Sequence, residues 1–121
     1  MNGSLRQWIE LLCFPVAIAA GQILFKRAAG QIAPGAGGSG WLLELARLPA
    51  MWMAIALYAA STLLWVRILT TVPLSRAYPF VALAFVFVPA AGYLFFQESI
   101  SARYALGTAL IVIGVVIAAR A

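Results

Sequence analysis

Apolar residues fill four long stretches of the chain, and polar residues gather in the segments between them. The stretches cover about residues 8–26, 49–70, 74–96 and 102–119. Each is close to the roughly 20 mostly apolar residues that an α-helix needs to cross a bilayer. The pattern therefore predicts an all-α fold, an integral membrane four-helix bundle in a single domain.

The connections between the stretches differ in length and composition. Residues 30–40 are rich in Gly, Ala and Pro, and residues 41–47 after them are expected to form a short interfacial helix. The glycines are irregularly spaced and no strand precedes them, so we interpret 30–40 as a linker and not as a phosphate-binding loop. The connections near 71–73 and 98–101 are very short. Successive helices must therefore run antiparallel.

Composition supports a membrane protein and narrows its chemistry. The chain has 121 residues, of which 65% are hydrophobic and 9% charged, whereas soluble domains have roughly 45–50% and 25%. One cysteine and no histidine or aspartate exclude an internal disulfide, a Cys/His metal site and the usual catalytic triads. We therefore expect neither an enzyme nor a cofactor or metal.

The excess of basic over acidic residues is explained by contact with the membrane. Eight basic and three acidic residues give a net charge of +5 without a basic run. We assign this excess to contacts with anionic membrane lipids and expect no nucleic-acid partner.

The first stretch resembles a secretory signal peptide in part, because Arg6 precedes an apolar run that contains Ala17-Ile18-Ala19. Glu10 fits such a peptide poorly, and the hydrophobicity continues to Phe25. We expect the first helix to be retained.

Basic residues do not specify the orientation in the membrane. Four lie on each side of the predicted bundle: Arg6, Arg67, Arg76 and Arg120 on one, and Lys26, Arg27, Arg47 and Arg103 on the other. An unbiased chain is what a dual-topology, antiparallel dimer would require. The alternative is that Arg67 and Arg76 face a cavity and do not count toward orientation.

Two arginines stand at the margins of the second and third stretches. Charged residues inside a span cost about 2.5–3.5 kcal/mol on insertion scales, which makes them candidates for function. Arg67 and Arg76 approach the same membrane face, where two guanidiniums are suited to binding a phosphate through paired hydrogen bonds. The alternative is that both side chains reach the phosphates of surrounding lipids.

Several uncharged polar and aromatic residues are further candidates. Gln22 and Lys26 share one face of the first helix. Gln22 suits a substrate hydroxyl or a bond to another helix, and Lys26 suits a lipid phosphate or interfacial anchoring. Tyr58, Trp65 and Tyr78 offer an aromatic and hydroxyl surface for a sugar, with helix packing or interfacial placement as the alternative.

The carboxylates are far apart in the sequence. Glu98 stands near Arg103, which suggests a structural ion pair or a water-facing helix terminus. A proton-coupling role would need a carboxylate deep in a cavity, and Glu10, in the first turn of the first stretch, is the other candidate for it.

Prolines and glycines predict local features of the last two helices. Pro79 and Pro89 each remove a backbone donor, so kinks are expected in the third helix. In the fourth, Gly114 and Ala118 form a small-xxx-small pair, with Gly107 two turns earlier. This pattern suits close helix contact, including contact between subunits.

Together these residues resemble the drug/metabolite transporter superfamily (EamA-like, small multidrug resistance-like) in its four-helix form. The nearer likeness is to the subunits of the aminoarabinose-phosphoundecaprenol flippase. It is carried by Ala20-Gly21-Gln22 with Lys26, Leu64-Trp65, Val72-Pro73-Leu74, Ala77-Tyr78-Pro79, Glu98, Ser101, Arg103, Gly107 and Gly114. It covers nearly the whole chain outside the Gly-rich connection.

The resemblance implies a protein of the bacterial cytoplasmic (inner) membrane that moves a polyprenyl-phosphate-linked sugar. It also implies a homodimer, or a heterodimer with a similar small subunit. We hypothesise that Arg67, Arg76 and Lys26 hold the phosphate and that Gln22, Tyr58 and Tyr78 contact the headgroup. Arg67 and Arg76 depart from the flippase pattern, which favours apolar residues there.

Two other functions remain open. Small multidrug resistance exporters use an acid in the middle of the first helix, and alignment on Lys26 places Ile18 there. An exporter of cationic compounds would therefore need Glu10 or Glu98 for coupling. The third hypothesis is an accessory subunit of a membrane glycosyltransferase.

Overall fold

The computed structural model describes residues 2–32, 38 and 40–121. Within them the elements are α1 (Asn2–Gly30), α2 (Gly40–Ala46), α3 (Pro49–Leu69), α4 (Leu74–Val81), α5 (Ala84–Phe96) and α6 (Ala102–Arg120). The described residues contain no strand. Four segments are long and apolar enough to cross a membrane: Leu5–Gly30, Pro49–Leu69, Leu74–Phe96 and Ala102–Arg120. The prediction of an all-α bundle with four spans is confirmed.

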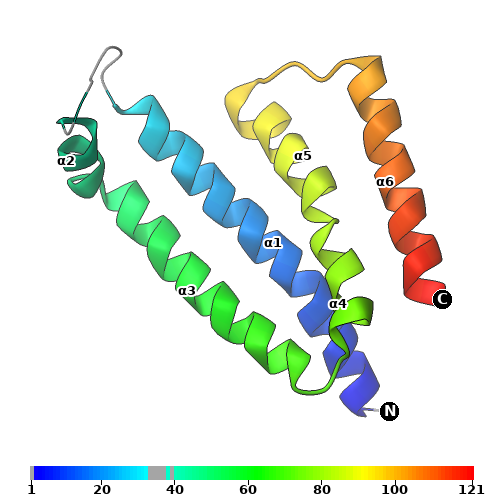
Figure 1. The fold of residues 1–121 in the computed structure, drawn as a ribbon. Coiled ribbons are helices and arrows are strands. Elements are labelled where there is room, and N and C mark those ends of the chain that lie inside the picture. Colours follow the sequence, from blue (N-terminus) through cyan, green and yellow to red (C-terminus); the bar gives the residue numbers. More distant parts are fainter. Residues whose placement is uncertain (1, 33–37, 39) are drawn as a thin grey trace.

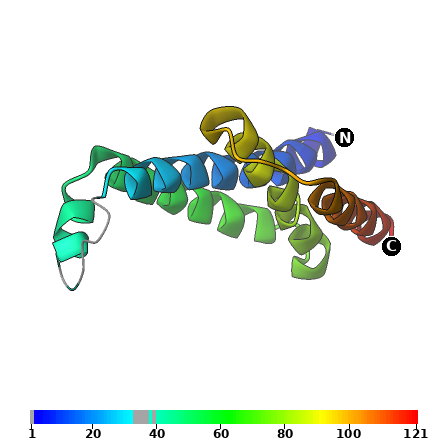
Figure 2. The same ribbon diagram turned by 90° about the horizontal axis from the view of Figure 1, so that it is seen from above.

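α1 and α3 lie side by side and antiparallel along most of their length (Figures 1 and 2). Aromatic rings join them, because Phe14 of α1 stacks on Trp65 of α3 with ring centroids 4.8 Å apart. Where α1 continues past this pair, Gly21 leaves room for the ring of Tyr58, which a side chain at position 21 would strike. These two helices form the most extensive helix–helix contact of the described structure.

The buried core lies toward the beginning of α1. It consists of Leu11, Phe14, Ile68, Val72, Ala77 and Phe80, from α1, α3, α4 and the connection between the last two. Trp8 closes this core from the α1 side through an edge contact with Phe80, at 5.5 Å between ring centroids. The core thus fixes the α3–α4 connection against α1.

The third span is broken into two helices, where a kink was predicted. The chain turns at 82–83, between Pro79 and Pro89 (Figure 1). At the turn, Ala82 N–H donates to the Pro79 carbonyl and Leu83 N–H to the Phe80 carbonyl, both at 3.1 Å. These bonds reach back three residues instead of four, so the helix tightens and changes direction.

α6 is the most loosely packed of the long helices. It packs against α4 and α5, and Val115 is its one buried residue (Figure 2). Large apolar side chains along it are exposed, among them Leu106, Leu110 and Ile117. Its first turn is capped, since Ser101 Oγ accepts a hydrogen bond from Tyr104 N–H at 3.0 Å.

The bundle has two polar ends. The N-terminal end comprises the beginnings of α1 and α4 and the ends of α3 and α6; the opposite end comprises α2, the ends of α1 and α5 and the beginning of α6 (Figure 1). This helix order places Arg6, Arg67, Arg76 and Arg120 at the N-terminal end and Lys26, Arg27, Arg47 and Arg103 at the opposite end.

Candidate functional site

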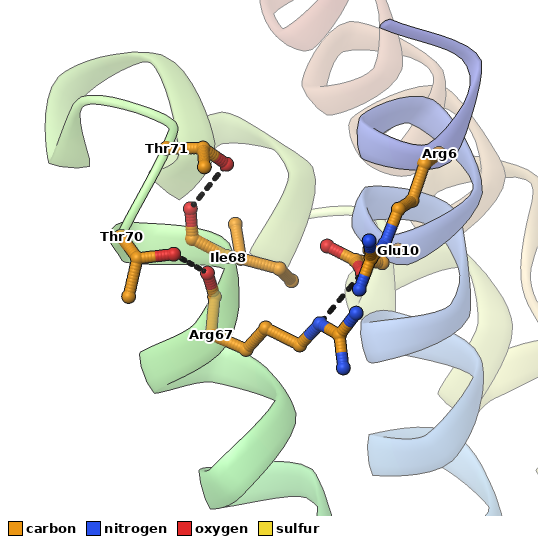
Figure 3. Close-up of polar contacts among 6 residues, drawn as sticks. All are labelled: Arg6, Glu10, Arg67, Ile68, Thr70 and Thr71. Carbon is orange, nitrogen blue, oxygen red and sulfur yellow. Dashed lines mark hydrogen bonds and ion pairs between the residues drawn. The ribbon is translucent and has the colours of Figure 1, made fainter. Parts of the chain in front are cut away.

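At the N-terminal end, one carboxylate joins two arginines from two helices. Glu10 Oε1 accepts a hydrogen bond from Nε of Arg6 at 3.1 Å and forms an ion pair with Arg67, whose Nε also lies at 3.1 Å. Figure 3 shows Arg67 reaching from α3 across to Glu10 on α1. The Glu10 side chain is only 15% exposed, whereas the arginines are exposed by more than half. We call these three residues the ion triad.

Local structure explains how the triad forms. Arg6 and Glu10 are four residues apart on α1 and therefore lie on the same face. Arg67 lies in the last turn of α3, where a cation is favoured by the helix dipole. Just beyond it, the Thr70 hydroxyl donates to the Arg67 carbonyl at 2.5 Å and the Thr71 hydroxyl donates to the Ile68 carbonyl at 3.4 Å. These bonds satisfy carbonyls at the helix end.

Arg76 lies at the same end as the triad. It lines a pocket of about 210 Å³, and Arg67 lines a neighbouring pocket of about 280 Å³. Gln7 and Thr71 belong to both pockets, so the two are adjacent. Within the described residues Arg76 forms no ion pair. Arg6 and Arg67 therefore pair with Glu10 while Arg76 lines the adjacent pocket, and the N-terminal end keeps a positive excess.

A second polar group lies toward the opposite end. The Gln22 side-chain amide donates to the Tyr58 hydroxyl at 2.5 Å, which links α1 to α3. Phe25 packs against the same tyrosine, with ring centroids 5.2 Å apart. The structure thus joins Gln22 and Tyr58, which the sequence analysis treated as separate candidates. A bond from Gln22 to another helix was one of its two expected roles.

Lys26 and Glu98 line one pocket of about 180 Å³ between α1 and α5, together with Gln22. Glu98 is exposed, as expected for a water-facing helix terminus. The suggested ion pair between Glu98 and Arg103 is not formed within the described part of the chain. The carboxylate of Glu98 instead lies against Gly92 of α5.

The other predicted residues divide between the core and the surface. Trp65 contacts the ring of Tyr78 edge-on at 6.3 Å, so these aromatics lie near the N-terminal end and away from the Gln22–Tyr58 pair. Gly107 and Gly114 on α6 are exposed, and a side chain at either position would meet no atom within 4 Å. They make no close contact with another helix of the described structure.

The three predicted phosphate ligands do not all come together, because Lys26 lies far from the two arginines. Glu10, which binds Arg67, and Lys26 lie on the same helix, 16 residues apart. At 1.5 Å per residue this separation is about 24 Å. A single phosphate cannot contact Arg67 and Lys26 at once in this structure. If Arg67, Arg76 and Lys26 all bind phosphate, Lys26 must do so at a separate site.

The architecture and the placement of polar residues define a class of protein. The four spans are mostly apolar, and Ser61 in the middle of α3 is a buried polar residue; the basic side chains lie toward the two ends. Within the described residues, no group of His, Cys, Asp and Glu is arranged to hold a metal. This is the organisation of a small multi-pass membrane protein.

Comparison with known proteins identifies the family. The chain is 34% identical over 112 residues to a protein of Klebsiella pneumoniae named "Probable 4-amino-4-deoxy-L-arabinose-phosphoundecaprenol flippase subunit ArnE", covering 91% of this chain and 93% of the relative. It is 33% identical over 118 residues to a protein of the same name from Yersinia pseudotuberculosis, covering 93% and 96%. The chain therefore belongs to the family of ArnE flippase subunits, multi-pass proteins of the bacterial inner membrane.

A third relative with this name, from Erwinia tasmaniensis, is 42% identical over 69 residues, which are 55% of this chain and 64% of the relative. No family model matches the chain. No solved structure matches it either.

Proposed function

We propose that the chain helps to move a polyprenyl-phosphate-linked sugar from one face of the inner membrane to the other and catalyses no covalent step. The relatives are named for such a lipid, an aminoarabinose joined through phosphate to undecaprenol. The observation that carries the proposal is the cationic N-terminal end, where Arg6, Arg67 and Arg76 outnumber Glu10.

The ion triad leaves donors for a phosphate. Each triad arginine uses Nε to bind Glu10, and its terminal amino groups have no partner among the described residues. Terminal guanidinium nitrogens bind phosphate oxygens in pairs, with a geometry that lysine does not offer. In our proposal Arg67 and Arg76 hold the phosphate at this end, and Trp65 and Tyr78 nearby stack against the sugar.

In our proposal, the opposite end of the bundle provides a second binding site for the headgroup. There Lys26 attracts the phosphate, while Gln22 and Tyr58 offer polar groups to sugar hydroxyls. The prenyl chain stays in the bilayer throughout. Movement between the two ends then follows the alternating-access principle, in which rearranged helices open one end and close the other.

We further propose that the chain works as a pair, with a second copy or with a similar small subunit. The relatives are named as flippase subunits. α6 supports the pairing, because large apolar side chains along it, among them Leu106, Leu110 and Ile117, are exposed. A Cβ added at Gly107 or Gly114 would meet nothing within 4 Å among the described residues. Small residues on an exposed helix face permit close approach of another helix.

Reconstitution tests the proposed function. Liposomes with the purified chain, and membrane vesicles from cells that overproduce it, are loaded with undecaprenyl-phosphate aminoarabinose, and lipid reaching the far leaflet is measured with an impermeant amine reagent. Loss of both phosphate-binding arginines in R67A/R76A should slow transfer at least about tenfold, because charge-assisted hydrogen bonds contribute about 1.5–3 kcal/mol each.

The control removes a similar charge elsewhere. R47A alters an exposed arginine beyond α2 that has no ion-pair partner among the described residues, and transfer should be unchanged. The proposal is wrong if neither preparation of the unaltered chain accelerates transfer.

A further inference from the structure

A continuous groove runs between α1, α5 and α6 toward the opposite end of the bundle. Three pockets of about 180, 280 and 360 Å³ adjoin there. All three include Val88; the first and third share Gln22, the first and second share Glu98, and the second and third share Tyr104. We call the joined pockets the α5 groove.

The polarity of the α5 groove changes along its length. One part is lined by Lys26, Glu98 and Gln22. The other is lined mostly by apolar residues, among them Ile18, Ala84 and Phe85, with Gln22 and Tyr104 as its polar residues. A surface with a charged head and an apolar flank matches an amphiphile whose headgroup lies at the membrane surface and whose chain enters the bilayer.

The backbone at the end of α5 directs the Glu98 carboxylate into this groove. Gln97 adopts the left-handed conformation, with φ 55° and ψ 32°, which favours glycine. The N–H groups of Gln97 and Glu98 both donate to the Gly92 carbonyl, so the chain folds back over the last turns of α5. The Glu98 carboxylate then occupies the space above Gly92 that a methyl group would fill, with its Cδ at 3.3 Å from that position.

The two charges in the groove face one cavity without neutralising each other. Lys26 and Glu98 line the same pocket, yet within the described residues they form no ion pair. A ligand with only a phosphate would be attracted by Lys26 and repelled by Glu98. A ligand that carries both a phosphate and an ammonium group satisfies both side chains.

We propose that Glu98 is a specificity-determining residue that binds the ammonium group of the cargo headgroup in the α5 groove, while Lys26 binds its phosphate. This inference rests on the proposed function, because the cargo is the polyprenyl-phosphate sugar considered there. It adds the requirement for a free amine and assigns that requirement to one carboxylate.

Binding to two matched lipids tests the inference. The chain in nanodiscs is titrated with undecaprenyl-phosphate aminoarabinose and with the same lipid after N-acetylation, which removes the positive charge and leaves the phosphate. The unaltered chain should bind the free amine at least tenfold more tightly. E98Q should bind the two lipids equally, through weaker binding of the amine and unchanged or tighter binding of the acetylated lipid.

Two further variants distinguish the effect of the Glu98 carboxylate's position from the effect of total charge. G92A keeps the total charge but places a methyl group where the Glu98 carboxylate lies, and it should also reduce the preference for the amine. E44Q removes one negative charge from α2, outside the groove, and should keep the full preference.

The outcomes distinguish the inference from the proposed function. If the unaltered chain binds both lipids equally, or E98Q retains the tenfold preference, the role of Glu98 is wrong while lipid transport stands. If the unaltered chain binds neither lipid, the proposed function and the inference are both overturned.

Discussion

Glu10 is the only acidic side chain at the N-terminal end of the bundle, where four arginines lie. One oxygen accepts a hydrogen bond from Arg6 on its own helix and forms an ion pair with Arg67 on a neighbouring helix. The carboxylate reduces the repulsion between two guanidiniums that both lie within 3.1 Å of it. It also ties α1 to α3 at the edge of the buried core.

The substitution E10Q should therefore destabilise the bundle. It removes the negative charge between two arginines, and we expect a loss of about 1 kcal/mol, since the arginines are partly solvated. Thermal unfolding in detergent measures it. E44Q, which lacks an ion pair in the described structure, should change stability by less than about 0.5 kcal/mol; equal losses in the two variants would contradict a special role for Glu10.

Gly21 offers a second test at the residue scale. A methyl group there would strike the Tyr58 ring, with Cδ2 at 2.7 Å, so G21A must displace the ring and disturb the Gln22–Tyr58 bond. Overpacking of this kind costs about 1–3 kcal/mol. G30A serves as the control, because an added Cβ there meets nothing within 4 Å. The same unfolding assay should show a loss in G21A alone, and an unaffected midpoint would disprove the close approach.

Among the helical elements, α5 ends in a strained residue: Gln97 has left-handed backbone angles and directly precedes Glu98. Left-handed backbone costs a residue with a side chain roughly 1 kcal/mol relative to glycine. Q97G should therefore raise the free energy of unfolding by about 1 kcal/mol and leave Glu98 in place. A90G, at an exposed position inside the same helix, should lower it by about 1 kcal/mol. If Q97G instead lowered the free energy of unfolding, residue 97 would not have the left-handed conformation in the folded protein.

The elements themselves follow closely from the sequence. Runs of apolar residues predict all four spans, and a helix expected at 41–47 is present as Gly40–Ala46. Pro79 and Pro89 predict a distortion of the third helix, but the break falls between them, at 82–83. Its position depends on packing of α4 against the core, which proline chemistry alone does not determine.

The contacts that build the candidate sites are less predictable. Arg6 and Glu10 are visible as a pair at helical spacing, whereas Arg67 joins them from another helix. Gln22 and Tyr58 are 36 residues apart and meet only because Gly21 lets α3 approach. The direction of the Glu98 side chain depends on one left-handed residue, which no composition rule assigns to glutamine.

For the whole molecule, α6 determines the proposed pairing. Gly107 and Gly114 lie on the same side of the helix, because seven residues make almost two full turns. G114L should weaken self-association in detergent at least about tenfold if that side packs closely on a partner. A109L adds similar bulk on another side and should have little effect. Sedimentation equilibrium measures both, and equal association constants for G114L and the unaltered chain would exclude this face.

The even number of spans has a consequence for how two copies can be linked. α1 begins and α6 ends at the same end of the bundle (Figure 1). A short peptide that joins the end of one copy to the beginning of the next keeps both copies in the same orientation. An antiparallel pair needs an additional membrane crossing between them. Transport by a directly joined tandem, compared with one joined through an extra helix, therefore reads out the relative orientation of the partners.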